Sequence, residues 1–226
     1  MLSFAFVFSF AVFATAGSAF ADPGQVRIHG DGIGSHEIKR DKAQTVRSAA
    51  WGTPIGVIET AQDPAAVRHS DGTHETLRPG LTVYRGDQLV TGRTGASVVV
   101  FNDQSTASLG PDSQLLLDEL VYDPAARQGS ETVSVLKGVL VFASGQIAKM
   151  NPNAMTVRTP VATIGIRGTT FGVHYQTNRP LTVMLLEDAD GSIGELSVSN
   201  GAGAVTLNRR HQATRVAGLG SAPTAP

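Results

Sequence analysis

Short runs of β-branched and aliphatic residues recur along the chain from Ile55 onward, at about one run every ten residues, with a turn signal after each run. The clearest turn signals are Asp71-Gly72, Asp190-Gly191 and Asn200-Gly201, because Asp-Gly and Asn-Gly pairs accept the positive φ angles of tight hairpin turns. This spacing is typical of an all-β fold rather than of βαβ units. The rhythm alone leaves a short solenoid, a sandwich and a barrel open.

Two local patterns give sharper predictions. Lys137-Gly138 predicts a turn that joins strands at residues 132–136 and 139–143 into a hairpin. Residues 218–226, which end in Ala-Pro-Thr-Ala-Pro, carry too little apolar surface to hold themselves in place. We therefore expect a β domain over residues 54–217, followed by a disordered tail.

The first 21 residues have the pattern of a secretory signal peptide. An apolar run at residues 4–15 precedes Ala19-Phe20-Ala21, which has the form of a cleavage site. The chain contains no cysteine, so the exported protein can have neither a disulfide nor a lipid anchor at this position. We expect a periplasmic or secreted protein with an N-terminal extension or cap at residues 22–53, in which Trp51 covers one end of the β core.

The charge of the chain is close to balance, with a formal net charge of −1. Such a chain favours neither nucleic acid nor an anionic membrane surface as a partner. After the signal peptide, no apolar run reaches the length of a transmembrane helix, so we expect no membrane span in the mature protein.

Residues 157–175 form the most unusual stretch of the chain, and they predict two strands joined by a turn. Arg167 stands between Ile166 and Gly168 in this otherwise apolar run. Burying an unpaired guanidinium group costs several kcal/mol or more, so Arg167 requires an acidic partner, for which Asp87 is the first candidate. Two interpretations stay open: a structural ion pair between strands, and an arginine that binds a ligand carboxylate.

The same stretch resembles the signature of the FecR domain, a periplasmic module. The matching residues are Thr159, Pro160, Val161, Ala162, Gly165, Ile166, Arg167, Gly168, Thr169, Phe171 and Val173. A second string in the order of that family consists of Gly80, Gly86, Asp87, Thr91, Phe101, Asp103, Ser105 and Ser113. The resemblance covers roughly residues 54–198 and implies a β-solenoid-like stack of short strands and hairpins, with a jelly-roll-like β-sandwich as the alternative.

The resemblance also implies a type of function. In the family, the module typically lies in an inner-membrane regulator that receives a signal from an outer-membrane transporter and controls a sigma factor. The cleavable signal peptide expected here departs from that arrangement, so we expect a soluble binding or scaffolding role in which the family-signature residues are structural.

Metal binding and catalysis find little support in the sequence. His29 and His36 flank one Asp-Gly pair and His69 and His74 flank another, and together they offer metal-ligand types. The second cluster is better explained as a hairpin turn that places both histidines near solvent. His174, a lone histidine at a strand end, is a weak candidate for a base, and no nucleophile elbow or phosphate loop is present. We expect no catalysis, no cofactor and no metal.

Two functions therefore remain as expectations. The first is a non-catalytic module that binds a protein partner in the periplasm or cell envelope and takes part in signalling. The alternative is an envelope protein that binds a carbohydrate or another small ligand in a cleft lined by Arg167, His174 and Tyr175.

Overall fold

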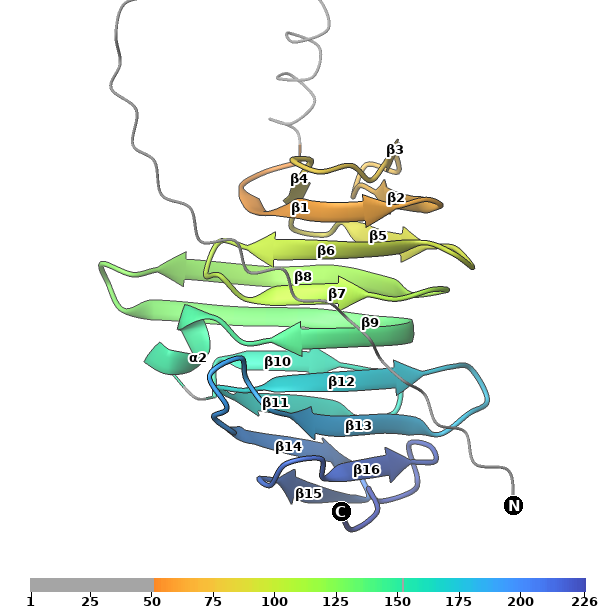
Figure 1. Ribbon diagram of the computed structural model, residues 1–226, viewed down its shortest axis with the longest axis vertical. Coiled ribbons are helices and arrows are strands. Elements are labelled where there is room, and N and C mark those ends of the chain that lie inside the picture. Colours follow the sequence, from red (N-terminus) through yellow and green to blue (C-terminus); the bar gives the residue numbers. More distant parts are fainter. Residues whose placement is uncertain (1–50, 152) are drawn as a thin grey trace, which may run out of the picture. The chain divides into compact units, whose positions relative to one another are not determined.

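The computed structural model describes residues 51–151 and 153–226 (Figure 1). The predicted signal peptide, most of the predicted N-terminal extension, and His29 and His36 lie outside the described residues. Within the described part of the chain, no helix has the length and apolar character needed to cross a membrane.

Sixteen strands form two sheets that share one strand, β9. Across sheet A the order is β4 (Thr82–Tyr84), β1 (Pro54–Gln62), β6 (Ala96–Phe101), β7 (Thr106–Leu109), the second half of β9 (Gln128–Ala143), β12 (Thr170–Tyr175), β13 (Leu181–Leu186) and β16 (Ala213–Val216). Across sheet B it is β3 (His74–Thr76), β2 (Ala65–Arg68), β5 (Gln88–Thr91), β8 (Gln114–Asp123), the first half of β9, β10 (Met155–Arg158), β11 (Thr163–Arg167), β14 (Glu195–Asn200) and β15 (Gly203–Leu207). All neighbours are antiparallel except β9 and β10, which are parallel.

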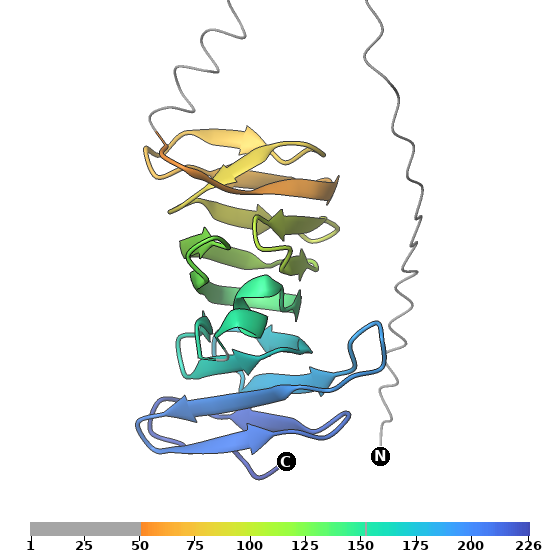
Figure 2. The same ribbon diagram turned by 90° about the vertical axis from the view of Figure 1, so that its left-hand side faces the viewer.

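The strands β3 and β4 lie at one end of the stack, beside β2 and β1. From β5 onward the chain winds between the two sheets and adds strands in sequence order, so the colours in Figures 1 and 2 run steadily to β15 and β16 at the other end. The predicted all-β class is confirmed. Only one short helix, α2 (Gln146–Met150), interrupts the strands of the described residues.

The strand β9 passes from sheet B to sheet A without a break, so the hairpin predicted at Lys137-Gly138 is wrong. Its first half buries odd-numbered residues such as Val133, whereas its second half buries even-numbered residues such as Leu140. The alternation shifts at Gly138, which has a φ of +111° and lies in the segment that links the two sheets. Gly138 therefore marks a bend of one strand between the two sheets. In the sequence, such a glycine cannot be distinguished from the glycine of a hairpin turn.

One apolar core fills the space between the sheets, and the alternation along each strand supplies it. In sheet A, Phe171 of β12 is fully buried and its ring stacks on that of Phe142 of β9, with ring centroids 5.3 Å apart. Leu196 and Val198 of β14 enter the same core from sheet B. The interior is thus built by residues far apart in the sequence, as a two-sheet fold requires.

The C-terminal tail is held on the domain, which differs from the predicted disorder. The Thr224 N–H donates to Arg215 O (2.9 Å), and the Arg215 N–H donates to Thr224 Oγ1 (3.0 Å), so the tail covers the outer edge of β16. The side-chain amide of Asn200 donates to Ser221 O (2.8 Å) and ties the tail to β14 as well. Backbone and amide hydrogen bonds, rather than apolar burial, hold residues 218–226.

Candidate functional site

The signature segment contains three strands rather than the two predicted, and its first turn is shaped by Thr159. β10 and β11 pair as a hairpin. At its turn, the Thr159 hydroxyl oxygen accepts hydrogen bonds from the N–H groups of Val161 (3.3 Å) and Ala162 (3.0 Å) and donates one to Ala162 O (2.8 Å). Pro160 is exposed at the tip, where a residue without an N–H is suitable. Thr159 and Pro160 therefore act as turn residues.

The signature then passes from sheet B to sheet A between β11 and β12. Gly168 lies at this crossing with a φ of +59°, and Thr169 beside it is fully buried. Gly194 packs so closely on the crossing that an added Cβ would lie 2.0 Å from Gly168 O and 2.3 Å from Arg167 O. Gly165, on the outer face of β11, has ordinary room for a Cβ. The crossing, rather than the strand itself, requires glycine.

Arg167 does not pair with Asp87, so that prediction is wrong. It points out of sheet B with its side chain 50% exposed, and its Nη1 lies 2.5 Å from Glu195 Oε1 on the neighbouring strand β14. Its Nη2 donates a second hydrogen bond to Asn153 Oδ1 (3.2 Å). The premise of burial was incorrect because Arg167 occupies an outward position in the alternation of β11.

Replacing Arg167 with alanine is expected to leave the domain folded. An exposed ion pair contributes less than about 1 kcal/mol, because water screens the charges and two long side chains lose freedom. Thermal unfolding of Arg167→Ala, followed by circular dichroism, should show a midpoint within about 4 °C of the wild type. A much larger loss would mean that the guanidinium group supports the core after all.

Asp87 instead forms a buried pair with His69. Its Oδ1 lies 2.9 Å from His69 Nδ1, and its Oδ2 accepts the Tyr84 N–H (2.8 Å). Burial raises the pKa of Asp87, and the hydrogen bonds from Tyr84 and His69 oppose that shift. His69 is 2% exposed, so its predicted position near solvent is wrong, whereas its neighbour His74 is exposed as predicted. The pair holds the loop after β2 against the turn between β4 and β5.

Trp51 covers this pair, as the sequence predicted for one end of the core. Its ring stacks on His69 with centroids 3.7 Å apart, and its indole N–H donates to Asp71 Oδ2 (2.9 Å). The Thr73 hydroxyl and the Trp51 indole lower the pKa of Asp71 to about 2. His69 Nε2 is buried without a hydrogen-bond partner among the described residues. Trp51 thus seals a small polar cluster at the β2 and β4 end of the domain.

The single tryptophan of the chain provides a direct probe of this cluster. Because Trp51 is only 8% exposed, its fluorescence should be blue-shifted and weakly quenched by acrylamide. The variant His69→Ala removes the stacked ring, so its emission should shift to the red and its quenching should rise. The control His74→Ala, on the exposed face of β3, should leave the spectrum unchanged; equal spectra for all three proteins would contradict the stacking.

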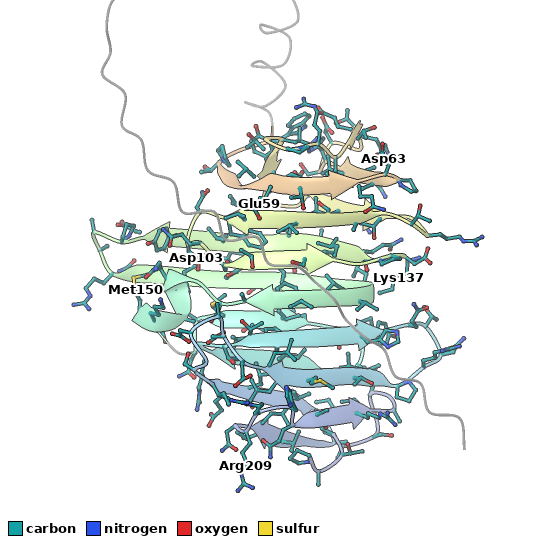
Figure 3. The ribbon with its side chains drawn as sticks, viewed as in Figure 1. Glu59, Asp63, Asp103, Lys137, Met150 and Arg209 are labelled. Atoms are coloured by element: carbon teal, nitrogen blue, oxygen red, sulfur yellow. The ribbon has the colours of Figure 1, made fainter. Side chains whose placement is uncertain are left out.

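A second buried polar cluster lies between the sheets and consists of Asp103, Ser105 and Glu131 (Asp103 is labelled in Figure 3). Ser105 Oγ is 2.6 Å from Asp103 Oδ1 and 3.0 Å from Glu131 Oε2. A hydroxyl group has one proton to donate, so one of the two carboxyl groups must supply the other. A protonated Glu131 that donates to Ser105, which in turn donates to Asp103, satisfies all three groups.

The environment of Glu131 agrees with that arrangement. Burial, and next the negative charge of Asp103, raise the pKa of Glu131 to about 8, against the opposing hydrogen bond of Ser105. The adjoining cavity has a volume of about 10 Å³ for water centres, which is room for about one water molecule. The remaining hydrogen-bonding groups of Asp103 hold the start of α2: its Oδ2 accepts the N–H of Ile147 (3.2 Å). The cluster locks the sheets together and leaves no space for a larger ligand.

Thr91 and Ser113, from the second family-like string, stabilise the bend of β9 on the opposite side. Thr91 Oγ1 accepts the Ser113 N–H (3.0 Å) and donates to Gly110 O (2.6 Å). Ser113 Oγ accepts the Val139 N–H (3.0 Å), directly after Gly138. The buried polar residues of that string therefore satisfy backbone groups at points where the chain turns or changes sheet.

The cleft suggested by the alternative function is not formed by its predicted residues. Arg167 points out of sheet B, whereas His174 is exposed on β12 of sheet A and Tyr175 packs against the core. Neither the cavity beside Glu131 nor a shallow groove at residues 63–66 contains any of the three. Within residues 51–151 and 153–226, no three His, Asp or Glu side chains gather closely enough to hold a metal ion.

Sequence reasoning missed Glu131 and Glu195 as partners. Glu131 lies in a stretch of alternating polar and apolar residues. It is two residues before Val133 and four before Val135, so the alternation of a strand puts all three on the same inward face, and this is the one signal in the sequence that Glu131 is buried. Glu195 is 28 residues from Arg167, and no local pattern links them.

Comparison with known proteins gives a family match and matches to solved structures. The sequence profile of the family described as FecR protein matches residues 87–189. Two crystal structures of a candidate anti-sigma factor from Parabacteroides distasonis ATCC 8503, at 2.50 and 1.65 Å resolution, match with TM-scores of 0.46 and 0.45 and 14% sequence identity each. Each match covers 61% of this chain and 57% of that protein's chain. No curated protein matches the chain.

Proposed function

We propose that this chain, whose residues 87–189 form a FecR domain, is an exported protein that acts by binding a protein partner at the cell envelope. FecR domains are typically non-catalytic and belong to signalling proteins, which supports a contact module rather than an enzyme. The signal peptide pattern at residues 1–21 supports a periplasmic or secreted location.

The main support for this proposal is a contrast between the buried polar residues of the domain and the exposed Arg167. The buried ones, such as Asp87, Asp103 and Glu131, make their hydrogen bonds inside the domain, and the cavity beside Glu131 has room for about one water molecule. Arg167 is different, because it belongs to the signature and is half exposed. An exposed arginine with a planar, hydrogen-bonding head group is well suited to a protein contact. We therefore place the contact surface on sheet B around Arg167 and Glu195.

Affinity capture from envelope extract tests the proposal. Residues 22–226 are immobilised as the wild type, as Arg167→Ala, and as Arg158→Ala, which removes another exposed arginine, on the adjacent strand β10. We expect one envelope protein to be retained by the wild type and by Arg158→Ala and to be lost with Arg167→Ala. Retention by all three would move the contact surface elsewhere, and no retained protein would argue against a protein partner.

The proposed location has its own test. Intact mass measurement of the protein from the periplasmic fraction or the medium should give a chain that begins at Asp22. A full-length chain found in the cytoplasm would contradict export.

A further inference from the structure

The outer faces of the two sheets differ in kind. In a two-sheet protein, the outward positions of both sheets normally carry polar side chains. Sheet B follows this rule from β9 to β15, where the outward positions are Thr132, Ser134, Thr156, Arg158, Thr163, Gly165, Arg167, Glu195, Ser197, Ser199, Ala204 and Thr206. Most of these residues carry a hydroxyl group or a charge. From β9 to β15 the outer face of sheet B is therefore an ordinary solvated surface, whereas β5 and β8 of the same sheet place Val90, Leu116 and Val121 outward.

The outer face of sheet A carries more apolar side chains, although polar residues lie among them. We use the name sheet A face for the outward positions of its seven strands from β1 to β16, whose apolar members are Val57, Ala96, Val98, Val100, Val139, Val141, Ala143, Met184, Leu186 and Ala213. Val57 and Met184 are 45% and 39% exposed. The strand registers place Val98, Val141 and Met184 in one row across the sheet, because Val98 pairs with Ser108, Ser108 with Val141, and Gly172 with both Val141 and Met184. Ser108 and Gly172 lie between these three side chains, and Thr60, Gln62, Thr106, Thr170 and Thr182 also face outward. The face is thus a mixture of apolar and polar side chains, which is the composition of many reversible protein interfaces.

Charges on the sheet A face sit at its two opposite ends. At one end, a bulge in β1 sets Glu59 beside Thr60 opposite Val98, so that Glu59 shares the outward face (Figure 3). At the other end, Arg215 points outward from β16. Apart from His174, no other titratable side chain occupies an outward position on the described strands from β1 to β16 of this sheet.

We propose that the sheet A face binds a second copy of this chain. β9 is the middle strand of the seven, and Val141 lies near the centre of the face. A two-fold axis along β9 packs Val141 against its counterpart and sets the β1 end of each copy against the β16 end of the other. Glu59 of each copy then comes within reach of Arg215 of the other, so the apolar centre and both charges are self-complementary. This inference does not depend on the partner proposed above.

The size of the face sets the expected strength of the dimer. Seven strands at about 4.8 Å spacing, with three rows of side chains, cover on the order of 500 Å² per copy, or about 1,000 Å² in total. This area lies near the lower limit for a specific interface, so we expect reversible association with a dissociation constant on the order of micromolar.

Sedimentation velocity of residues 22–226 over a range from about 1 to about 100 μM, which brackets that dissociation constant, tests the proposal. The wild type should shift from monomer to dimer. Val141→Lys should remain monomeric at every concentration, because two lysines would meet at the centre of the interface. Ser134→Lys, on the same strand but facing out of sheet B, should dimerise like the wild type.

A charge exchange tests the proposed two-fold arrangement. Glu59→Arg and Arg215→Glu should each raise the dissociation constant by about tenfold, since each places like charges together twice per dimer. The double variant restores opposite charges and should recover to within about threefold of the wild type.

Three outcomes would overturn the proposal. They are a wild type that is monomeric throughout, a Val141→Lys variant that dimerises normally, and a double variant that does not recover. Because the chain lacks cysteine, Val141→Cys offers one further readout. A monomeric protein in which this thiol is nevertheless protected from a maleimide probe would assign the sheet A face to another occupant.

Discussion

Replacing Glu131 with glutamine is expected to make the domain more stable at pH 8 and to change its stability little near pH 5. The folded state raises the pKa of Glu131 from its ordinary value of 4.5 to about 8. Below about pH 4.5, the carboxyl group is protonated in both the folded and the unfolded chain. Between these two values the folded chain keeps the proton and the unfolded chain loses it, so the stability of the wild type falls as the pH rises.

The size of this effect follows from the same shift. Each pKa unit corresponds to about 1.4 kcal/mol, so the wild type loses roughly 3–5 kcal/mol from Glu131 between pH 4.5 and pH 8. Glutamine has nearly the same shape and an amide N–H that can donate to Ser105, so it keeps the hydrogen-bond chain without titrating. Urea unfolding at several pH values should therefore show a difference between the two proteins that grows with pH.

A matched control separates this effect from the titration of other groups. Glu119→Gln removes an exposed acid on β8, opposite Thr132, and is expected to shift stability by less than about 0.5 kcal/mol. A Glu131→Gln variant whose stability difference from the wild type is constant from pH 5 to pH 8 would show that Glu131 is ionised inside the domain.

Replacing Gly138 with alanine is expected to destabilise the domain by about 3–5 kcal/mol. Two costs add at this position. Alanine disfavours the φ of +111° that the bend requires. Its Cβ would also lie 2.1 Å from Ser113 Oγ and 2.4 Å from Ser113 Cα, which belongs to the backbone and cannot rotate away. Chemical denaturation with urea would measure the loss.

Gly165→Ala is the matched control for the bend. An added Cβ at Gly165 finds its nearest neighbour, Ser197 Cβ, at 3.9 Å, and the φ of Gly165 lies outside the positive range. Its stability should change by less than about 1 kcal/mol. If Gly138→Ala were as mild as Gly165→Ala, β9 would not bend tightly between the sheets.

Much of the strand pattern was predictable because local chemistry sets it. The run at residues 96–101 alternates strictly between inward and outward side chains, and Asp71-Gly72 closes a hairpin as expected. Residues 181–186 and 213–216 also form strands, in keeping with the recurring apolar runs of the sequence. In each case the residues that decide the structure are neighbours in the sequence.

The errors arose where distant residues decide the structure. The partner of Arg167 is Glu195, which reaches it through the pairing of β11 with β14, and the partner of Asp87 is His69. The role of Gly138 depends on Ser113, which supports the bend from another strand. The prediction that residues 218–226 are disordered failed for a related reason. The side-chain amide of Asn200 anchors this tail, and the composition of the tail does not reveal a contact with so distant a residue.

The path of β9 underlies all the conclusions on function. It turns Glu131 into the interior, turns Val141 onto the sheet A face, and lines up β10 and β11 so that Arg167 points to solvent. A β9 that folded back at Gly138 could not pair with β10 in sheet B and with β7 and β12 in sheet A at once.

Cross-strand nuclear Overhauser effects in the isotope-labelled protein test this path most directly. We expect backbone contacts from Val133 to Val157 across the parallel pair with β10, and from Val141 to Gly172 across the antiparallel pair with β12. Both sets must come from one continuous strand. Contacts between Leu136 and Val139 of the kind that close a hairpin, together with the absence of those to Val157 and Gly172, would contradict the two-sheet arrangement and the surfaces inferred from it.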